Sequence, residues 1–290
     1  MFNDKVGLRI KAVPKSPVWR QTSRHFLTGG FRAIVAAILF FLILPTLIIM
    51  PMSINSGSYL RFPPEGFSLR WYRDYFADGD WMSATWFSLR IALATAATST
   101  IVGTLTALAV SRGRLPFSGL VHALAIGPLI VPHVVLGVGL FLVFSPLHLT
   151  GSFAGFLIAH TVLSVPFVVI PVNAALQRLD PALELAALNC GASRTAAFFH
   201  VTLPNIATSI GSGAVFAFLA SFDEATVAFF LSDVGGKPIG RKMFEDIDFN
   251  LTPVIAAAST VIVLASLSLI GLIQFMTKLK ISKQARGRIS

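Results

Sequence analysis

The feature that most constrains this chain is a series of apolar stretches, each long enough to cross the hydrocarbon core of a bilayer. A helix rises about 1.5 Å per residue, so a core of about 30 Å needs about 20 apolar residues. Backbone groups in lipid must bond within their own segment, so runs of this length predict helices rather than barrel strands. We therefore expect an all-α polytopic membrane protein with six transmembrane helices, at about residues 31–52, 83–110, 120–144, 153–176, 206–231 and 254–276.

Composition and charge agree with the bilayer as the main solvent. Of the 290 residues, 54% are hydrophobic and only 12% are charged, which is too apolar for an ordinary soluble domain. The net charge of +10 would suggest nucleic acid in a soluble protein. Here Lys and Arg lie between apolar runs and no basic polar domain is present, so nucleic-acid binding is not expected. The single cysteine, Cys190, excludes an intramolecular disulfide.

The distribution of Lys and Arg predicts the orientation of the spans. Sixteen of these residues lie in the segment up to Arg32, the turn after residue 110, the loop after residue 176 and the tail from Lys278, whereas the alternate loops hold six. Cytoplasmic loops carry the excess. We therefore expect a cytoplasmic N-terminal segment (1–30), a transmembrane domain (31–278) and a cytoplasmic tail (279–290). The first apolar run is too long for a signal-peptide core and is interpreted as a retained span.

The first outer connection, about residues 53–83, carries the aromatic and charged segment from Ser68 to Phe76. This composition predicts a short helix that lies in the membrane interface as an aromatic anchor. A contribution to docking an external partner is the alternative.

Local signals in the loop between the fourth and fifth spans, about residues 180–203, predict a short helix. Asp180 is a good N-cap and Pro181 suits the first helical position. Glu184, near the start, complements the helix dipole. Gly191 can adopt the left-handed conformation that ends such a helix.

A second short helix is expected directly after this turn. Ser193 can cap a helix that runs toward Leu203, and Pro204 would then open the fifth span. The resulting helical hairpin would expose Ala186 and Ala187, whose small side chains permit close approach of another protein.

At these positions the sequence resembles the permease subunits of bacterial ABC importers. The signature of that family is Glu-Ala-Ala, three residues, Gly, nine residues, Ile, one residue and Leu-Pro. The glutamate position holds Leu185 with Glu184 one place earlier, and Asn189 stands where Asp is common. Segments 128–137 and 221–225 look like the spermidine/putrescine branch, and the resemblance covers about residues 30–280. The residues that match the signature, with Val201 in place of Ile, are Ala186, Ala187, Gly191, Val201, Leu203 and Pro204.

The resemblance implies that this hairpin is a coupling helix seated in a groove of a separate ATPase. The chain has no Gly-x-x-x-x-Gly-Lys-Ser/Thr loop of its own, so ATP and Mg would be bound by the partner ATPase and no cofactor by this chain. The implied partners are a homologous second permease, an ABC ATPase dimer, a periplasmic substrate-binding protein and the lipid bilayer of the bacterial inner membrane. A well-capped hairpin without a coupling role is the alternative. The expected coupling residues are Glu184, Ala186, Ala187, Gly191, Ala192, Ser193, Arg194, Leu203 and Pro204.

Candidate residues of a substrate pathway lie within the spans. Asp223 and Glu224 fall inside the fifth apolar stretch, where an ionised carboxylate is costly unless it faces protein, water or a cation. Either could pair with a cationic amine; an ion pair with Arg90 or a contact to a second permease is equally open. His133 stands where amine-importing relatives often carry an acidic residue, which would favour a substrate with a carboxylate or phosphonate.

Prolines are expected to kink two spans and to border a cavity, or to form simple bends relieved by neighbouring helices. They are Pro128 and Pro132 in the third span and Pro166 and Pro171 in the fourth.

The function that accounts best for these features is the permease subunit of an ATP-driven importer for a small polar solute, first of all a polyamine or related amine. Amino-acid derivatives, opines and aminophosphonates are alternative substrates, and an ion-gradient-driven transporter that uses Asp223 and Glu224 is an alternative class. No catalytic residues are expected, because no nucleophile and base suggest themselves. No His, Cys or carboxylate cluster has metal-ligand spacing, so no metal site is expected either.

Overall fold

The computed structural model describes residues 18–112, 116–233, 236–249 and 251–286. The start of the predicted N-terminal segment (residues 1–17), Arg114 in a basic turn and the end of the predicted tail (287–290) lie outside these ranges. The chain divides into two compact units, one ending at Met50 and one beginning at Pro51. The first unit holds most of helix α1, and the second holds all the other elements.

The described residues are almost entirely helical, and pairing of extended backbone is confined there to two isolated bridges, Asn55 with Phe67 and Asp233 with Gly236. In chain order the elements are α1 (Val18–Ser53), α2 (Arg70–Ala77), α3 (Gly79–Ser111), α4 (Ser118–Ile130), α5 (His133–Phe144), α6 (Phe153–Arg178), α7 (Pro181–Asn189), α8 (Arg194–Ala197), the π-helical turn η1 (Phe198–Thr202), α9 (Leu203–Phe222), α10 (Thr226–Leu231), α11 (Ile239–Phe249) and α12 (Val254–Arg286).

Four helical segments among the described residues are long and apolar enough to cross a membrane: Gly30–Ser53, Gly79–Ser111, Phe153–Arg178 and Arg194–Phe222. Helices α4 and α5 meet this test only as a pair and are bent by 110°. Helix α12 spans Val254–Arg286, and its stretch Val254–Ser268 is apolar. The six predicted spans thus correspond to six helical regions, of which the third (α4 and α5) and the fifth (α9 and α10) are each divided between two helices.

Proline explains that break, because the ring removes a donor and disfavours helix in the residue before it. Val131 is extended and Pro132 is the N-cap of α5. The expectation of a kink is confirmed at this proline. Pro128 lies within α4, and Pro166 and Pro171 lie within α6, which continues through both.

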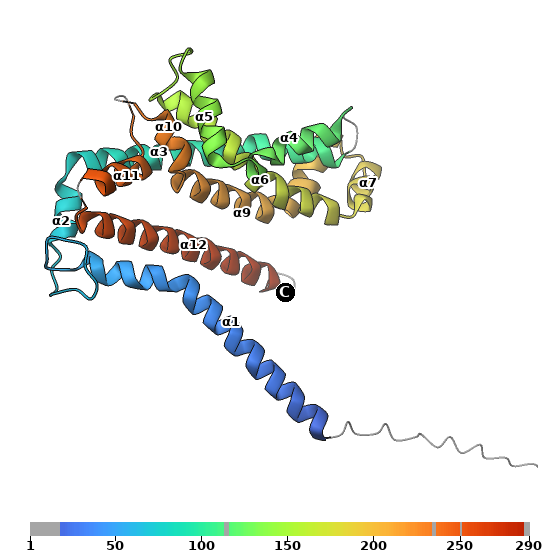
Figure 1. Cartoon of the computed structure of the whole chain (residues 1–290). Coiled ribbons are helices and arrows are strands. Elements are labelled where there is room, and N and C mark those ends of the chain that lie inside the picture. The colour runs from blue at the N-terminus through green and yellow to red at the C-terminus, as the bar shows by residue number, and fades with distance from the viewer. Residues whose placement is uncertain (1–17, 113–115, 234–235, 250, 287–290) are drawn as a thin grey trace, which may run out of the picture. The chain divides into compact units, whose positions relative to one another are not determined.

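The centre of the second unit is a layer of three helices, α3, α6 and α9, which lie side by side (Figure 1). Two glycines permit this close packing. A Cβ atom on Gly103 would lie 2.7 Å from Val168 Cβ, and one on Gly213 would lie 2.9 Å from Val168 Cα. A hydrogen bond of 2.7 Å between the hydroxyls of Thr98 and Thr161 joins α3 to α6. Small residues and interhelical hydrogen bonds of this kind are the usual means of helix association in membranes.

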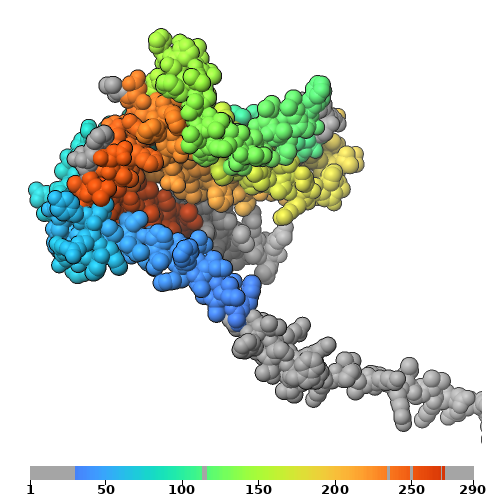
Figure 2. All heavy atoms as spheres, viewed as in Figure 1, coloured from blue at the N-terminus to red at the C-terminus, as the bar shows by residue number. Residues whose placement is uncertain are grey.

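The two ends of this layer carry different elements (Figure 1). Helices α2 and α11 gather at the end where α3 begins, and α7 lies at the end where α3 finishes. In Figure 2 the segment around α5 projects from the packed helices. The layer therefore separates a charged end near α11 from the hairpin that begins with α7.

The short helix predicted in the first outer connection is confirmed as α2. Two of its aromatic residues, however, are buried in the protein instead of lying free as an anchor, whereas Phe76 is exposed. Trp71 is 8% exposed and donates a hydrogen bond of 2.7 Å to the Asn55 carbonyl, and Tyr75 is fully buried. Helix α11 was not expected from the apolar pattern.

Candidate functional site

Helix α7 begins and ends with the signals that its sequence predicts. The Asp180 carboxylate accepts the Ala182 N–H at 2.9 Å, and Pro181 occupies the first turn. At the other end the Ala192 N–H donates to the Ala187 carbonyl and the Gly191 N–H to the Leu188 carbonyl, both at 3.0 Å. This pair of bonds is a Schellman motif. Its left-handed residue is Gly191, with φ +89°, so the expected glycine turn is confirmed.

The second arm of the hairpin leads directly into the fifth span. The Ser193 hydroxyl accepts the Ala196 N–H at 3.2 Å, as expected for a cap. The helix then continues through the π turn η1 into α9, which begins at Leu203 and holds Pro204 in its first turn, as the sequence predicts. A π turn has wider hydrogen bonding than an α-helix, and the Asn205 side chain donates to the Val201 carbonyl at 2.6 Å.

Glu184 joins the hairpin to the membrane helices. Its carboxylate lies 2.7 Å from the Arg112 guanidinium, which follows the end of α3. It also accepts a short hydrogen bond from the buried Thr202 hydroxyl in η1. One carboxylate therefore holds α7 against both α3 and the helix that leads into α9.

The outer surface of α7 is more apolar than the sequence interpretation recognised. Leu183 is 47% exposed, Leu185 is 59% exposed and Leu188 is also exposed. Ala186 is exposed and Ala187 half-buried. An available signal was the run of leucines in a loop placed outside the bilayer. Exposed apolar groups of this kind mark contact surfaces.

The remaining predicted coupling residues surround the turn. Gly191, Ser193, Arg194 and Pro204 are exposed, whereas Ala192 and Leu203 are half-buried. The structure thus brings all nine predicted residues into one continuous hairpin, which we call the coupling hairpin (residues 180–204).

The predicted pathway carboxylates lie at a break between two helices, not inside one. Helix α9 ends at Phe222, and α10 begins at Thr226. The uninterrupted fifth span predicted to Leu231 is therefore wrong. Glu224 explains how the break is stabilised, because its Oε1 atom accepts the Val227 N–H of α10 at 2.9 Å.

The second oxygen of Glu224 reaches the other broken helix. Its Oε2 atom lies 2.8 Å from His133 Nδ1, at the first residue of α5. The Glu224 side chain is 7% exposed and that of His133 is 47% exposed. The two helix breaks are thus joined at one point, which we call the junction (His133, Asp223 and Glu224). Close packing continues along it, because a Cβ atom on Gly137 in α5 would lie 2.5 Å from the Phe230 ring of α10.

Asp223 and Arg90 have different surroundings. Asp223 is exposed directly beside buried Glu224, and no contact with its carboxylate is found among the described residues. Arg90 is exposed on α3 and forms no ion pair within the described part of the chain. The predicted alternative of an ion pair between Arg90 and a junction carboxylate is therefore wrong for Glu224, whose partner is His133.

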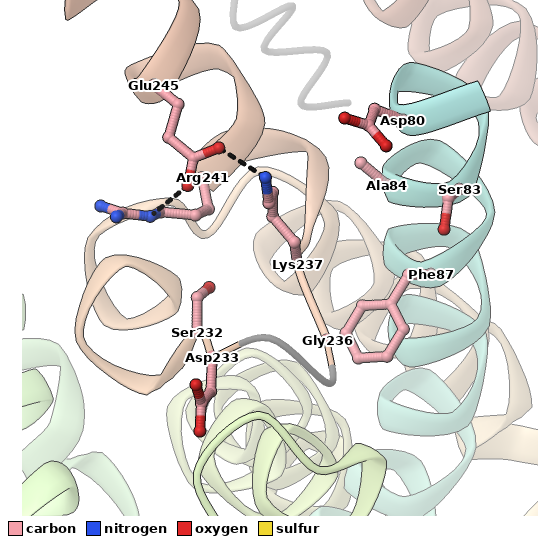
Figure 3. Close-up of a pocket in the computed structure, with 10 residues that line it drawn as sticks. All are labelled: Asp80, Ser83, Ala84, Phe87, Ser232, Asp233, Gly236, Lys237, Arg241 and Glu245. Carbon is pink, nitrogen blue, oxygen red and sulfur yellow. Dashed lines mark hydrogen bonds and ion pairs between the residues drawn. The ribbon is translucent and has the colours of Figure 1, made fainter. Parts of the chain in front are cut away.

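A polar pocket of about 510 Å³ lies at the end of the helix layer remote from the coupling hairpin (Figure 3). It is enclosed by the start of α3 and by the segments around Ser232 and Lys237. The Glu245 carboxylate lies 2.6 Å from Lys237 Nζ and 3.2 Å from Arg241 Nε. Burial opposes ionisation of Glu245, but the hydrogen bond from Lys237 and the nearby cations outweigh it and lower its pKa. The pocket wall therefore carries a cluster with one more cation than carboxylate, and Asp80 lies on the facing side.

Comparison with known proteins identifies the family. The family model described as "Binding-protein-dependent transport system inner membrane component" matches residues 99–279. The chain belongs to this family. The permease is thus a multi-pass inner membrane transport component rather than an enzyme, in a system that also includes an ATPase and a substrate-binding protein.

Individual relatives extend the match to most of the permease. The putrescine transport system permease protein PotI of Escherichia coli (strain K12) is 33% identical over 251 residues, which cover 84% of this chain and 89% of that protein. The spermidine/putrescine transport system permease protein PotC of Haemophilus influenzae is 29% identical over 256 residues, covering 88% and 98%.

A solved structure supports the fold. A bacterial ABC transporter involved in the import of the acidic polysaccharide alginate has a chain with a TM-score of 0.71 and 17% identity, covering 90% of the permease and 99% of that chain. The expected type I importer permease fold is confirmed.

Proposed function

We propose that the permease forms the path by which an ATP-driven importer moves a polyamine, putrescine or a related amine, across the inner membrane. The observation that carries the choice of a cationic substrate is the exposed carboxylate of Asp223 at a helix break within an apolar stretch. Two relatives that share most of their length with the permease are named as putrescine or spermidine/putrescine permeases.

The junction gives its two carboxylates different roles. Glu224 is compensated, since it accepts a backbone N–H of α10 and contacts His133. Asp223 has no such compensation among the described residues, and an ionised group at membrane depth requires water or a cation. A primary ammonium group supplies a positive charge and three donors. We therefore assign transient contact with the substrate amine to Asp223 and a structural role to the pair of Glu224 and His133.

The contact between His133 and Glu224 also bears on whether an imidazole at position 133 disfavours a cationic substrate. An imidazole in place of an acidic residue would disfavour a cation if it faced the pathway alone. Here its Nδ1 atom is directed to Glu224, so the two groups offset each other. This pairing supports an amine in preference to a substrate that carries a carboxylate or phosphonate.

The coupling hairpin is the proposed contact with the ATPase. Its exposed leucines and its glycine turn form a preorganised surface, and Glu184 ties that surface to α3 and η1. From Arg194 the helix runs without a break to Phe222, a length of 29 residues or about 43 Å. Displacement of the hairpin would thus be transmitted along one rigid helix to Asp223.

The proposed orientation places the coupling hairpin and both termini in the cytoplasm. The excess of Lys and Arg on that side supports it. The pocket beside Glu245 (Figure 3) would then face the substrate-binding protein. A pair of ATPase subunits and a second, homologous permease complete the proposed assembly.

Transport by the reconstituted complex tests the proposal. Proteoliposomes containing the permease with its partner subunits should take up putrescine only when binding protein and ATP are supplied. Asp223→Asn should lower the uptake at least tenfold, because it removes the charge and retains the shape. Asp248→Asn is the matched control, since Asp248 is exposed in α11, away from the junction. Full uptake by the Asp223 variant would refute the assigned pathway, and uptake without the ATPase would refute the proposed function.

A further inference from the structure

Part of the exposed surface of the coupling hairpin is recessed into a groove. The groove has a volume of about 340 Å³ and lies between α7 and the start of the second arm. Leu185 and Leu188 contribute apolar walls, while Arg112, Glu184 and Arg194 contribute charge. A contact surface that is only convex would not need such a recess.

The charges in this groove do not balance. Glu184 is already held by Arg112 and by the Thr202 hydroxyl. Arg194 is exposed and has no ion pair within the part of the chain that the structure describes. The nearby carboxylate of Asp180 caps the start of α7 through the Ala182 N–H. One guanidinium therefore remains to be paired, between leucine side chains.

Leucine at position 185 strengthens this arrangement. The side chain is 59% exposed and lines the groove, so no carboxylate at this position competes for Arg194. An arginine paired through its planar fork of donors is well suited to hold a carboxylate at an interface.

We propose that the groove receives an acidic side chain, flanked by aliphatic residues, from the ATPase subunit. The two proteins would thereby interlock in both directions, with α7 presented to the ATPase and an ATPase side chain inserted between α7 and α8. This inference rests on the proposed function, since it assumes that the hairpin contacts the ATPase. The positive charge of Arg194 and the leucine walls specify the chemistry of the inserted segment.

Binding of the purified ATPase to the full-length permease assembly in nanodiscs tests the groove. Arg194→Glu should weaken binding ten- to a hundredfold, and Arg194→Lys, which keeps the charge but loses the fork, should weaken it less. Arg178→Glu is the matched control, because Arg178 is an exposed arginine outside this groove; it should bind within twofold of the unmodified protein. An unchanged elution volume and an unchanged thermal unfolding midpoint would show that Arg194→Glu remains folded.

Charge reversal in the ATPase identifies the inserted residue. One Asp→Lys or Glu→Lys variant of the ATPase should restore binding to the Arg194→Glu permease. Equal binding by the Arg194→Glu and unmodified proteins would overturn the inference, as would the absence of any restoring ATPase variant. If ATPase binding by the unmodified permease requires anionic lipid, and this requirement disappears in Arg194→Glu, the groove binds a lipid headgroup. That result would also overturn the inference. If the unmodified permease fails to bind the ATPase at all, it is the proposed function that fails.

Discussion

Gly191 allows a direct test of the coupling hairpin, because backbone strain and steric clash can be told apart at this residue. Its φ of +89° lies in the left-handed region, and a Cβ atom added there would meet no atom within 4 Å in this chain. A substitution is therefore opposed by backbone conformation and not by a steric clash. Holding a residue with a Cβ in the left-handed region costs about 1–2 kcal/mol, and a β-branched side chain is the least tolerated.

This free energy translates into a loss of the correct turn. A cost of about 1–2 kcal/mol lowers the population of the hairpin conformation about 5- to 30-fold relative to its alternatives. Gly191→Val should therefore be inserted normally but should lose most ATP-dependent uptake. Gly191→Asn adds a side chain of similar size, yet Asn adopts the left-handed conformation readily. It should retain most of the uptake.

The assay is putrescine uptake by proteoliposomes, with ATP hydrolysis measured in the same samples. The expected signature of Gly191→Val is hydrolysis that no longer responds to binding protein and substrate. Equal loss in the Asn and Val variants would refute the conformational argument, because the defect would then follow from side-chain bulk on the docking face.

Three further predictions concern the helices and the outer pocket. In a double-mutant cycle, His133→Ala and Glu224→Ala should show a coupling energy of about 1–2 kcal/mol in the free energy of unfolding, measured by reversible unfolding in mixed micelles. This energy is at the low end for a buried pair because the His133 side chain is 47% exposed. A coupling energy under about 0.5 kcal/mol would contradict the contact between the two residues. Gly213→Ala should lower the free energy of unfolding by about 1–3 kcal/mol, because the added Cβ atom would lie 2.9 Å from Val168 Cα. Gly211→Ala is the control and should be neutral or stabilising, because its Cβ atom would meet nothing within 4 Å. Equal effects of the two variants would show that the packing of α3, α6 and α9 has room to adjust. Because the pKa of Glu245 is lowered, its ion pairs stabilise the fold above the ordinary carboxyl pKa, and this stabilisation is lost as the pH falls through the lower pKa of the folded state. Glu245→Gln should therefore have a lower melting temperature than the unmodified protein at pH 7, and this difference should disappear in acid. A difference in melting temperature that does not change with pH would count against the ion pairs.

The sequence predicts the helical class and most spans because length and hydropathy are properties of each segment alone. The capping signals of α7 are also local, and Asp180, Gly191 and Ser193 take the predicted roles. The fifth span is predicted correctly at its start, where Pro204 lies in the first turn of α9. Its apolar run conceals the end of that helix at Phe222, although the two adjacent carboxylates that follow are a signal for a helix break.

The contacts that define the sites were not predictable from local patterns. Glu184 pairs with Arg112, and His133 pairs with Glu224, across long stretches of sequence. Such pairs depend on how α3, α6 and α9 pack, which periodicity does not specify. Helix α11 did leave a local signal, because Arg241 and Glu245 are spaced as an i, i+4 ion pair.

The most direct test of the account is to identify what touches the coupling hairpin during transport. Cys190 is the only cysteine of the chain and is exposed next to Gly191, so a thiol-linked photoreactive probe can be attached there without mutation. On illumination of the actively transporting complex, we expect a cross-link to the nucleotide-hydrolysing subunit, with a yield that changes when ATP is supplied. Cross-links confined to the external binding protein, in a complex that still imports solute, would contradict it.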